Sequence, residues 1–371
     1  MHGTGYRVDQ ARVAKICLGS FPGFGSRSLR KIWAAFSRPE EAWSASAQAL
    51  KRVGIQESTV ERFTAWRKTC VPSRFIEQLE KESIRVLFRD DAEYPQSLQL
   101  STDPPEILFV RGTLKDIPAI AVVGTRRITM YGKSCVDGIV PDLARAGFAI
   151  VSGMALGIDG AVHRATLDAR GTTVAILGTG VDDAALYPRE HVALAQEIIK
   201  SGGAVVSEFP PGTQSFKVHF PIRNRLIAAW ALATLVIEAD LDSGSLITAK
   251  LALEENHEVL AIPGPIWADQ SRGANSLLKS GAKICTQAAD VLEAIAFDQP
   301  ELIAQARASL PMDPTEQNII DALAEPKHID DLTTEIGLDP GSMSGKMALL
   351  EIKGLVKPIG GQMWIKTRQK E

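Results

Sequence analysis

Six apolar runs of strand length, separated by stretches of helical character, constrain the fold of this chain more than any other feature. Most contain Val, Ile, Leu and Ala without polar alternation, which is typical of strands buried on both faces of a parallel sheet. The pattern predicts an α/β, Rossmann-like, doubly wound fold with a mainly parallel sheet, whose ligands lie outside the carboxyl ends of the strands. The runs are Ala119–Val123, Phe148–Val151, Thr173–Leu177, Ala204–Ser207, Ala233–Glu238 and Val259–Ile262.

Two further parts flank this α/β part, which we expect at residues 84–298. Residues 1–75 predict short helices with two glycine turns, at 21–25 and 52–55, as in helix-hairpin-helix or SAM-like domains. The first 70 residues carry 12 Lys and Arg against 5 Asp and Glu, within a chain of net charge −3. This basic helical domain suits a polyanion partner, but a domain that only packs or docks explains the pattern equally well.

Residues 312–368 predict a winged-helix domain. Three helical stretches, 315–323, 329–336 and 340–353, precede a hairpin with a Gly360-Gly361 turn. The third helix carries only Lys346 and Lys353, whereas a helix that reads the major groove needs several Arg, Lys, Asn or Gln. We therefore expect this domain to have an accessory or protein-contact role.

Several functional classes lack their signatures in this sequence. The four cysteines form no Cys-x-x-Cys pair, and we find no secretory signal or membrane-spanning run, so we expect a cytoplasmic protein. Neither Gly-x-Gly-x-x-Gly nor a P-loop occurs, and no nucleophile elbow or metal-ligand set is evident; His163 follows Asp159 by four residues without a third ligand. We expect no catalytic residue, metal or cofactor. A nucleotide-binding enzyme of Rossmann-like fold, similar to phosphoribohydrolases, remains the alternative.

Glycine and small residues follow almost every expected strand. Such turns expose backbone N–H groups, and the helix that follows adds its positive end, so each turn could bind an anion. Tight strand-to-helix packing explains any one of these glycines alone. Several turns side by side could follow a phosphate chain. The residues concerned are Gly124-Thr125-Arg126, Gly153, Gly178-Thr179-Gly180 and Ser243-Gly244-Ser245.

The stretch from Lys217 to Ile227 combines cations and an aromatic residue at an expected helix start. Lys217, Arg223 and Arg225 are predicted phosphate contacts, and Phe220 has the setting of a base-stacking platform for a single strand. The alternatives are that Phe220 lies in the core and that the arginines pair with Glu208 or Glu238.

Taken together and in order, these motifs resemble those of the DNA-processing protein A (DprA/Smf) family over roughly residues 85–290. The resemblance implies a non-catalytic protein that binds single-stranded DNA, protects incoming DNA and helps to load the RecA recombinase in natural transformation and recombination. It also implies a homodimer formed through the Rossmann-like domain, which carries the DNA site. The DNA-binding residues expected on this basis are Gly124, Thr125, Arg126, Gly153, Arg189, Lys217, Phe220, Arg223, Asn224, Arg225, Ser243, Gly244 and Ser245.

Overall fold

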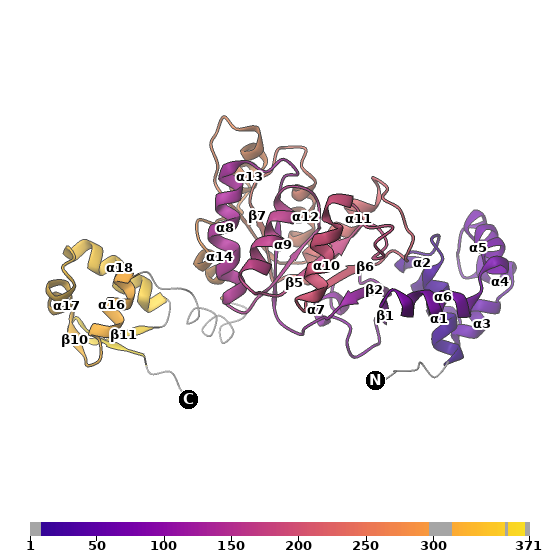
Figure 1. The fold of residues 1–371 in the computed structure, drawn as a ribbon, viewed down its shortest axis with the longest axis horizontal. Helices are drawn as coiled ribbons and strands as arrows, with labels where there is room; N and C mark the ends of the chain where they lie inside the picture. The colour runs from indigo at the N-terminus through magenta and orange to yellow at the C-terminus, as the bar shows by residue number, and fades with distance from the viewer. Residues whose placement is uncertain (1–8, 297–313, 353–354, 368–371) are drawn as a thin grey trace.

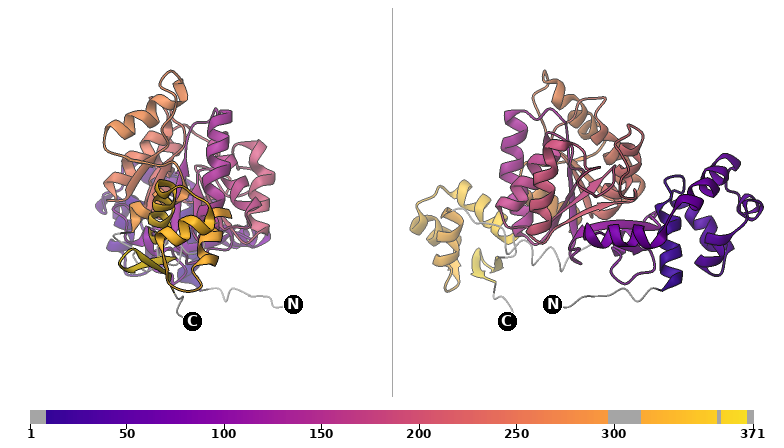
Figure 2. Two further views of the ribbon diagram at one scale, coloured as in Figure 1. Left: turned by 90° about the vertical axis from the view of Figure 1, so that its left-hand side faces the viewer. Right: turned by 45° about the vertical axis from the view of Figure 1, so that its right-hand side comes forward.

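The computed structural model describes residues 9–296, 314–352 and 355–367 (Figure 1). Within these ranges the chain forms a helical part, an α/β part and a C-terminal part with its own core (Figure 2). None of the described helices is long and apolar enough to cross a lipid bilayer.

The helical part is built from short helices around a cluster of aromatic side chains. Its rings contact one another at centroid distances of 4.8 Å between Phe21 and Phe24 and 5.3 Å between Phe21 and Phe63. The helices are α1 (Gln10–Ser20), α2 (Ser26–Ala35), α3 (Pro39–Ser44), α4 (Ala47–Arg52), α5 (Glu57–Thr69) and α6 (Pro72–Lys81). The helical part therefore continues to Lys81.

One sheet dominates the α/β part. Its strands follow the order β1-β2-β6-β5-β4-β3-β7-β8-β9. All pairings from β6 to β9 are parallel, whereas β1 pairs with β2, and β2 with β6, in antiparallel fashion. The strands are β1 (Arg85–Phe88), β2 (Ile107–Gly112), β3 (Ala119–Val123), β4 (Ala149–Ser152), β5 (Thr173–Leu177), β6 (Ala204–Ser207), β7 (Ala233–Val236), β8 (Glu258–Ala261) and β9 (Lys283–Ile284). The six expected strands are thus present within a residue or two at each end, and the doubly wound prediction is confirmed; β1, β2 and β9 were not expected.

The strand order places a topological switch point between β3 and β7. From β3 the chain adds β4, β5 and β6 on one side, then returns to place β7 and β8 on the other side of β3. The loops that leave β3 and β7 therefore diverge and open a crevice at the carboxyl edge of the sheet, where doubly wound folds bind their ligands.

Helices cover both faces of the sheet because strand side chains alternate between the faces. Ile120 and Val122 pack with α8 and α9 on one face, whereas Ala121 and Val123 pack with α11 and α12 on the other. The helices are α7 (Gln96–Gln99), α8 (Met130–Arg145), α9 (Ile158–Asp168), the short 3₁₀ helix η1 (Arg189–His191), α10 (Val192–Lys200), α11 (His219–Trp230), α12 (Gly244–Glu254), α13 (Asp269–Lys279) and α14 (Ala288–Ile295).

The helical part shares its core with the sheet. Leu18, Leu29 and Phe63 belong to one buried cluster with Leu177 of β5 and Val205 of β6. Removing these helices would expose apolar strand and α10 side chains to water, so the two parts stabilise each other.

The C-terminal part forms a winged helix, as predicted. Its three helices, α16 (Pro314–Ala322), α17 (Ile329–Ile336) and α18 (Pro340–Ile352), pack against a small sheet of order β10-β12-β11. The predicted hairpin is β11 (Val356–Gly360) and β12 (Met363–Lys366), and the two residues between them, Gly361 and Gln362, both have the positive φ that such a turn requires. The remaining strand is β10 (Lys327–His328).

Candidate nucleic-acid interface

A polar cleft of about 640 Å³ lies at the switch point between β3 and β7. The loops after these strands, the start of α11 and the start of α12 form its walls. It is lined by Val123, Gly124, Thr125, Arg126, Arg127, Ala155, Asp159, Lys217, Phe220, Pro221, Arg223, Asn224, Ile227, Asp240, Asp242, Ser243, Gly244, Ser245, Ile247, Thr248, Asp269 and Gln270. Most of the expected DNA-binding residues, separated by more than 100 positions in the chain, therefore meet at one site.

The loop after β3 is held by its own backbone. The Thr125 amide donates to the carbonyl of Glu238 at 2.7 Å, and the Thr125 hydroxyl accepts from the Arg127 amide at 3.1 Å. These two N–H groups are therefore already used within the protein, so this loop offers fewer free N–H groups to an anion than the sequence suggested. The loop instead presents the exposed guanidinium groups of Arg126 and Arg127 to the cleft.

The second wall is the N-terminus of α12. Ser243 is the N-cap, and its hydroxyl lies 2.8 Å from that of Ser245. A Cβ atom at the exposed Gly244 would meet nothing within 4 Å, so an approaching group has open access to this helix end. Asn224 fixes the wall from α11 by donating to the Gly244 carbonyl at 3.2 Å. A helix N-terminus with open access favours an anion.

Arg223 lies beneath the cleft and is almost fully buried. Its guanidinium donates to the carbonyls of Gly153 and Ile176 and to the Asn224 side chain. Burial lowers the pKa of Arg223 to about 10, the charge of Asp159 opposes this shift, and the nearby charge of Arg126 adds to it. Arg223 therefore remains charged at neutral pH and brings positive charge to the floor of the cleft.

Gly153 is required by this buried arrangement. A Cβ atom there would lie 2.6 Å from Arg223 Nη2 and 2.7 Å from Asp159 Oδ2. Burial raises the pKa of Asp159, and the charge of Arg223 counteracts that effect. Gly153 itself is buried and does not line the cleft. A glycine is needed at this position because a side chain would collide with Arg223 and Asp159, and not because it contacts a ligand.

Phe220 and its neighbours give the cleft an aromatic wall. The Arg126 guanidinium carbon lies 5.3 Å from the centroid of the Phe220 ring, and the Tyr187 ring lies 6.1 Å from it. Phe220 is partly exposed, not a core residue. Among the ion pairs of the described residues, none involves Arg126, Arg127 or Lys217. The mouth of the cleft therefore combines an accessible ring with unneutralised cations.

The structure does not bring Arg225 or Arg189 into the cleft. Arg225 pairs with Glu208 at 2.5 Å and donates to the Asp103 carbonyl at 2.6 Å, so the ion pair considered as an alternative is formed. Arg189 is exposed at the start of η1 and donates to the Asp183 carbonyl. A direct DNA contact by either residue stays a prediction.

Sequence reasoning missed the carboxylates on the far side of the cleft. Asp240, Asp242 and Asp269 line it near the ends of β7 and β8. Arg272 pairs with Asp240 at 3.1 Å and with Asp269 at 3.2 Å. The signal was present in the Asp240-Leu241-Asp242 sequence, which follows β7 after Ile237, Glu238 and Ala239. The edge is therefore polarised, with cations on the β3 and α11 side and carboxylates on the β7 and β8 side.

The first glycine turn of the helical part docks against the α/β part. Ser26, the first residue of α2, donates to the Glu208 carboxylate and accepts from the Glu106 amide at 2.9 Å. Arg30 of α2 pairs with Glu106 at 3.0 Å. The anions at this helix start are thus carboxylates of the same chain, which favours the docking interpretation of the turn.

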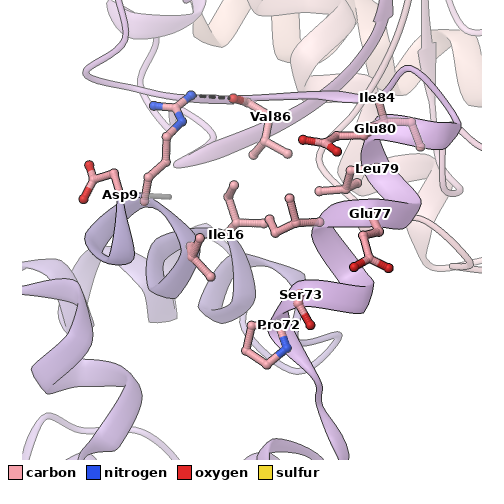
Figure 3. A pocket seen from close by; sticks show the side chains of 12 residues that line it. Asp9, Ile16, Pro72, Ser73, Glu77, Leu79, Glu80, Ile84 and Val86 are labelled. Carbon is pink, nitrogen blue, oxygen red and sulfur yellow. Dashed lines mark hydrogen bonds between the residues drawn. The ribbon is translucent and has the colours of Figure 1, made fainter. Parts of the chain in front are cut away.

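A second cavity, of about 360 Å³, lies within the helical part between α1, α6 and β1 (Figure 3). Ile16, Leu79 and Val86 contribute apolar walls, and Glu77 and Glu80 add carboxylates. This combination does not suit a polyanion, so the cleft at the sheet edge is the better candidate.

Comparison with known proteins agrees with this geometry. Residues 85–296 match the family model of the DNA recombination-mediator protein A, and residues 303–362 match the DprA winged helix domain. Protein Smf of a Synechocystis species is 31% identical over 382 residues, covering 92% of this chain and 95% of the relative. Protein Smf of Escherichia coli is 38% identical over 261 residues, covering 69% of each chain.

Two solved structures are also similar to this chain. DNA processing protein A of Streptococcus pneumoniae is 32% identical, with a TM-score of 0.64, covering 76% of this chain and 97% of that one. The Helicobacter pylori protein, whose structure was described for its single-stranded DNA binding mode, is 30% identical with a TM-score of 0.51, covering 58% and 96%. The match over most of the α/β part, together with a near full-length relative, shows that this chain belongs to the DNA recombination-mediator protein A family, also known as DprA or Smf.

Proposed function

We propose that this protein binds single-stranded DNA in the cleft between β3 and β7. The observation that carries the proposal is the Arg126 guanidinium placed over the accessible ring of Phe220, at the mouth of a cleft where Arg127 and Lys217 form no ion pair with any described residue. Arg126 and Lys217 would bind phosphates, Phe220 would stack on a base, and the Ser243-Gly244-Ser245 start of α12 would receive a phosphate. Asn224 and Arg223 would support this surface from below.

The accessible ring of Phe220 would give the protein a preference for single-stranded over double-stranded DNA. A base inside a duplex has its faces covered by its neighbours, so only an unpaired base can stack on Phe220. The Helicobacter pylori relative, described as binding single-stranded DNA, supports the same substrate class for this chain.

The experiment is fluorescence anisotropy with labelled oligo-dT and with the corresponding duplex. We expect oligo-dT to bind more tightly than duplex, and Phe220→Ala to lose roughly 1–3 kcal/mol of binding free energy. Arg126→Ala should weaken binding and reduce its salt dependence. A mononucleotide that competes as well as the oligonucleotide would instead favour a nucleotide-binding enzyme.

We further propose that the protein acts without catalysis, as a homodimer that helps to load RecA on the bound strand. Membership of a recombination-mediator family supports this role. Sedimentation at increasing protein concentration tests the dimer. Strand exchange by RecA, with and without this protein, tests loading, and the Arg126→Ala variant should fail to stimulate it.

A further inference from the structure

We infer that single-stranded DNA leaves the cleft over the ends of β5 and β6, where Tyr187 and Phe216 form a second base-stacking surface. The inference rests on the proposed function, because it assigns the path of the same strand beyond the cleft. Neither residue lines the cleft itself.

Aromatic side chains continue from Phe220 along this side of the edge. Tyr187, in the loop after β5, lies 6.1 Å from Phe220 between ring centroids and is 47% exposed. Phe216, in the loop after β6, is 58% exposed and contacts the His219 ring at 5.3 Å. His219 in turn stacks on Phe209 at 4.2 Å. The rings thus form two contacting groups, Tyr187 with Phe220 and Phe216 with His219 and Phe209, which adjoin in the chain because His219 directly precedes Phe220.

Hydrogen bonds position the backbone of Phe216 and the ring of His219 against which Phe216 packs. The His219 amide donates to the Phe216 carbonyl at 3.0 Å, so Phe216 lies one turn before α11. The His219 ring nitrogen Nδ1 lies 3.1 Å from the Gly178 carbonyl at the end of β5. A ring that is already fixed loses little conformational entropy when a base stacks on it.

Cations accompany the rings on this side. Lys217 follows Phe216 directly and is exposed, and Arg189 stands two residues after Tyr187, also exposed. Cations interleaved with accessible rings are the arrangement by which proteins hold single strands without reading their sequence. The proposed path thus gives Arg189, which lies outside the cleft, a contact with a phosphate of the same strand.

The opposite side of the edge offers a ring without these cations. Trp267, in the loop between β8 and α13, is 91% exposed, more than either Tyr187 or Phe216. It stands two residues before Asp269, on the side of the cleft that also carries Asp240 and Asp242. Arg272 pairs with Asp240 and Asp269 but leaves this group of carboxylates net negative, which disfavours a phosphate chain, so exposure of an aromatic ring alone does not make a DNA path.

The test compares Tyr187→Ala, Phe216→Ala and Trp267→Ala for binding of oligo-dT of about 5 and about 15 nucleotides, lengths that span the usual range of single-strand sites. We expect the first two variants to bind the longer strand about 5- to 150-fold more weakly and the shorter strand almost normally. Trp267→Ala should bind both like the parent protein. Tyr187→Phe should restore binding, because it keeps the ring, whereas Tyr187→Leu should not.

The outcomes separate this inference from the proposed function. Parent-like binding of the longer strand by both Tyr187→Ala and Phe216→Ala, with Phe220→Ala impaired, would overturn the second stacking surface and leave the cleft intact. Weaker binding in Trp267→Ala alone would overturn the direction of the path. A parent protein that binds no oligo-dT would overturn the proposed function and this inference together. Thermal unfolding of each variant confirms that a loss of affinity is not a loss of fold.

Discussion

Replacing Arg223 by alanine separates the role of this arginine in the fold from its role at the cleft. Its guanidinium is buried, donates to two carbonyls and one side-chain amide, and balances the buried Asp159. Removing one partner of a buried charged pair costs about 3–5 kcal/mol, because the other charge stays buried without compensation. We expect Arg223→Ala to lose about that much unfolding free energy.

The same numbers predict the thermal shift. For an α/β part of this size each kcal/mol moves the midpoint by about 2–4 °C, so Arg223→Ala should unfold roughly 6–20 °C below the parent by circular dichroism. The exposed Arg126→Ala is the matched control: it removes the same charge at the same cleft and should unfold within about 2 °C of the parent. DNA affinity of both variants is then compared at a temperature where both are folded.

A double variant tests the physical reason. Apolar residues in place of both members of a buried charged pair are often neutral for stability. Arg223→Met combined with Asp159→Leu should therefore recover much of the stability that Arg223→Met alone loses. If Arg223→Ala unfolds at the parent temperature, or if the double variant is less stable than the sum of the single variants, the assignment of Arg223 as a buried counterion is refuted.

Three further predictions concern charge. A double-mutant cycle of Arg225→Ala and Glu208→Gln should show a coupling of about 1–3 kcal/mol in unfolding free energy, and independence of the two changes would contradict their pairing. Burial lowers the pKa of His163 to about 3, below its ordinary 6.5, so the unfolded chain gains a proton between these values that the folded chain does not. Stability should fall as pH falls through that window, and His163→Gln should flatten the slope by at most about 1.4 kcal/mol per pH unit, measured by urea unfolding at about pH 7 and about pH 5. Lys217→Ala should reduce the log–log salt slope of oligo-dT binding by about 0.7, as should Arg126→Ala, and an unchanged slope would remove that residue from the phosphate contacts.

The sheet was predictable from the sequence because strands buried on both faces leave unbroken apolar runs. β3 and β5 coincide with the expected runs, and small residues after them indicated the carboxyl edge. β1 and β2 were not predicted because antiparallel strands need no crossover helix between them. The alternation of strand and helix that identified the parallel strands is therefore missing in that part of the sequence. The candidate site was predicted from the rule that doubly wound folds bind ligands at the carboxyl ends of their strands. That rule depends on the topology of the sheet and not on any single motif.

The orientation of the arginines was harder to predict, although helix geometry held part of the answer. Successive residues on a helix are about 100° apart, so Arg223 and Arg225 point about 200° apart and cannot both face one cleft. Which of them faces the cleft depends on Asp103 and Glu208, which are distant in sequence and lie next to the ends of the paired strands β2 and β6. No local pattern carries that information.

Helix α11 thereby joins the two halves of the molecule. Phe220 and Arg223 face the cleft, and Arg225 on the opposite side enters the network that receives Ser26 through the Glu208 carboxylate. Helix α11, which carries Phe220 at the cleft, is thus linked through Arg225 and Glu208 to Ser26 of the helical part. The sequence left DNA binding and docking equally open for the basic helical part. Ser26, at the start of its helix α2, donates to the Glu208 carboxylate of this chain, which favours docking at this point.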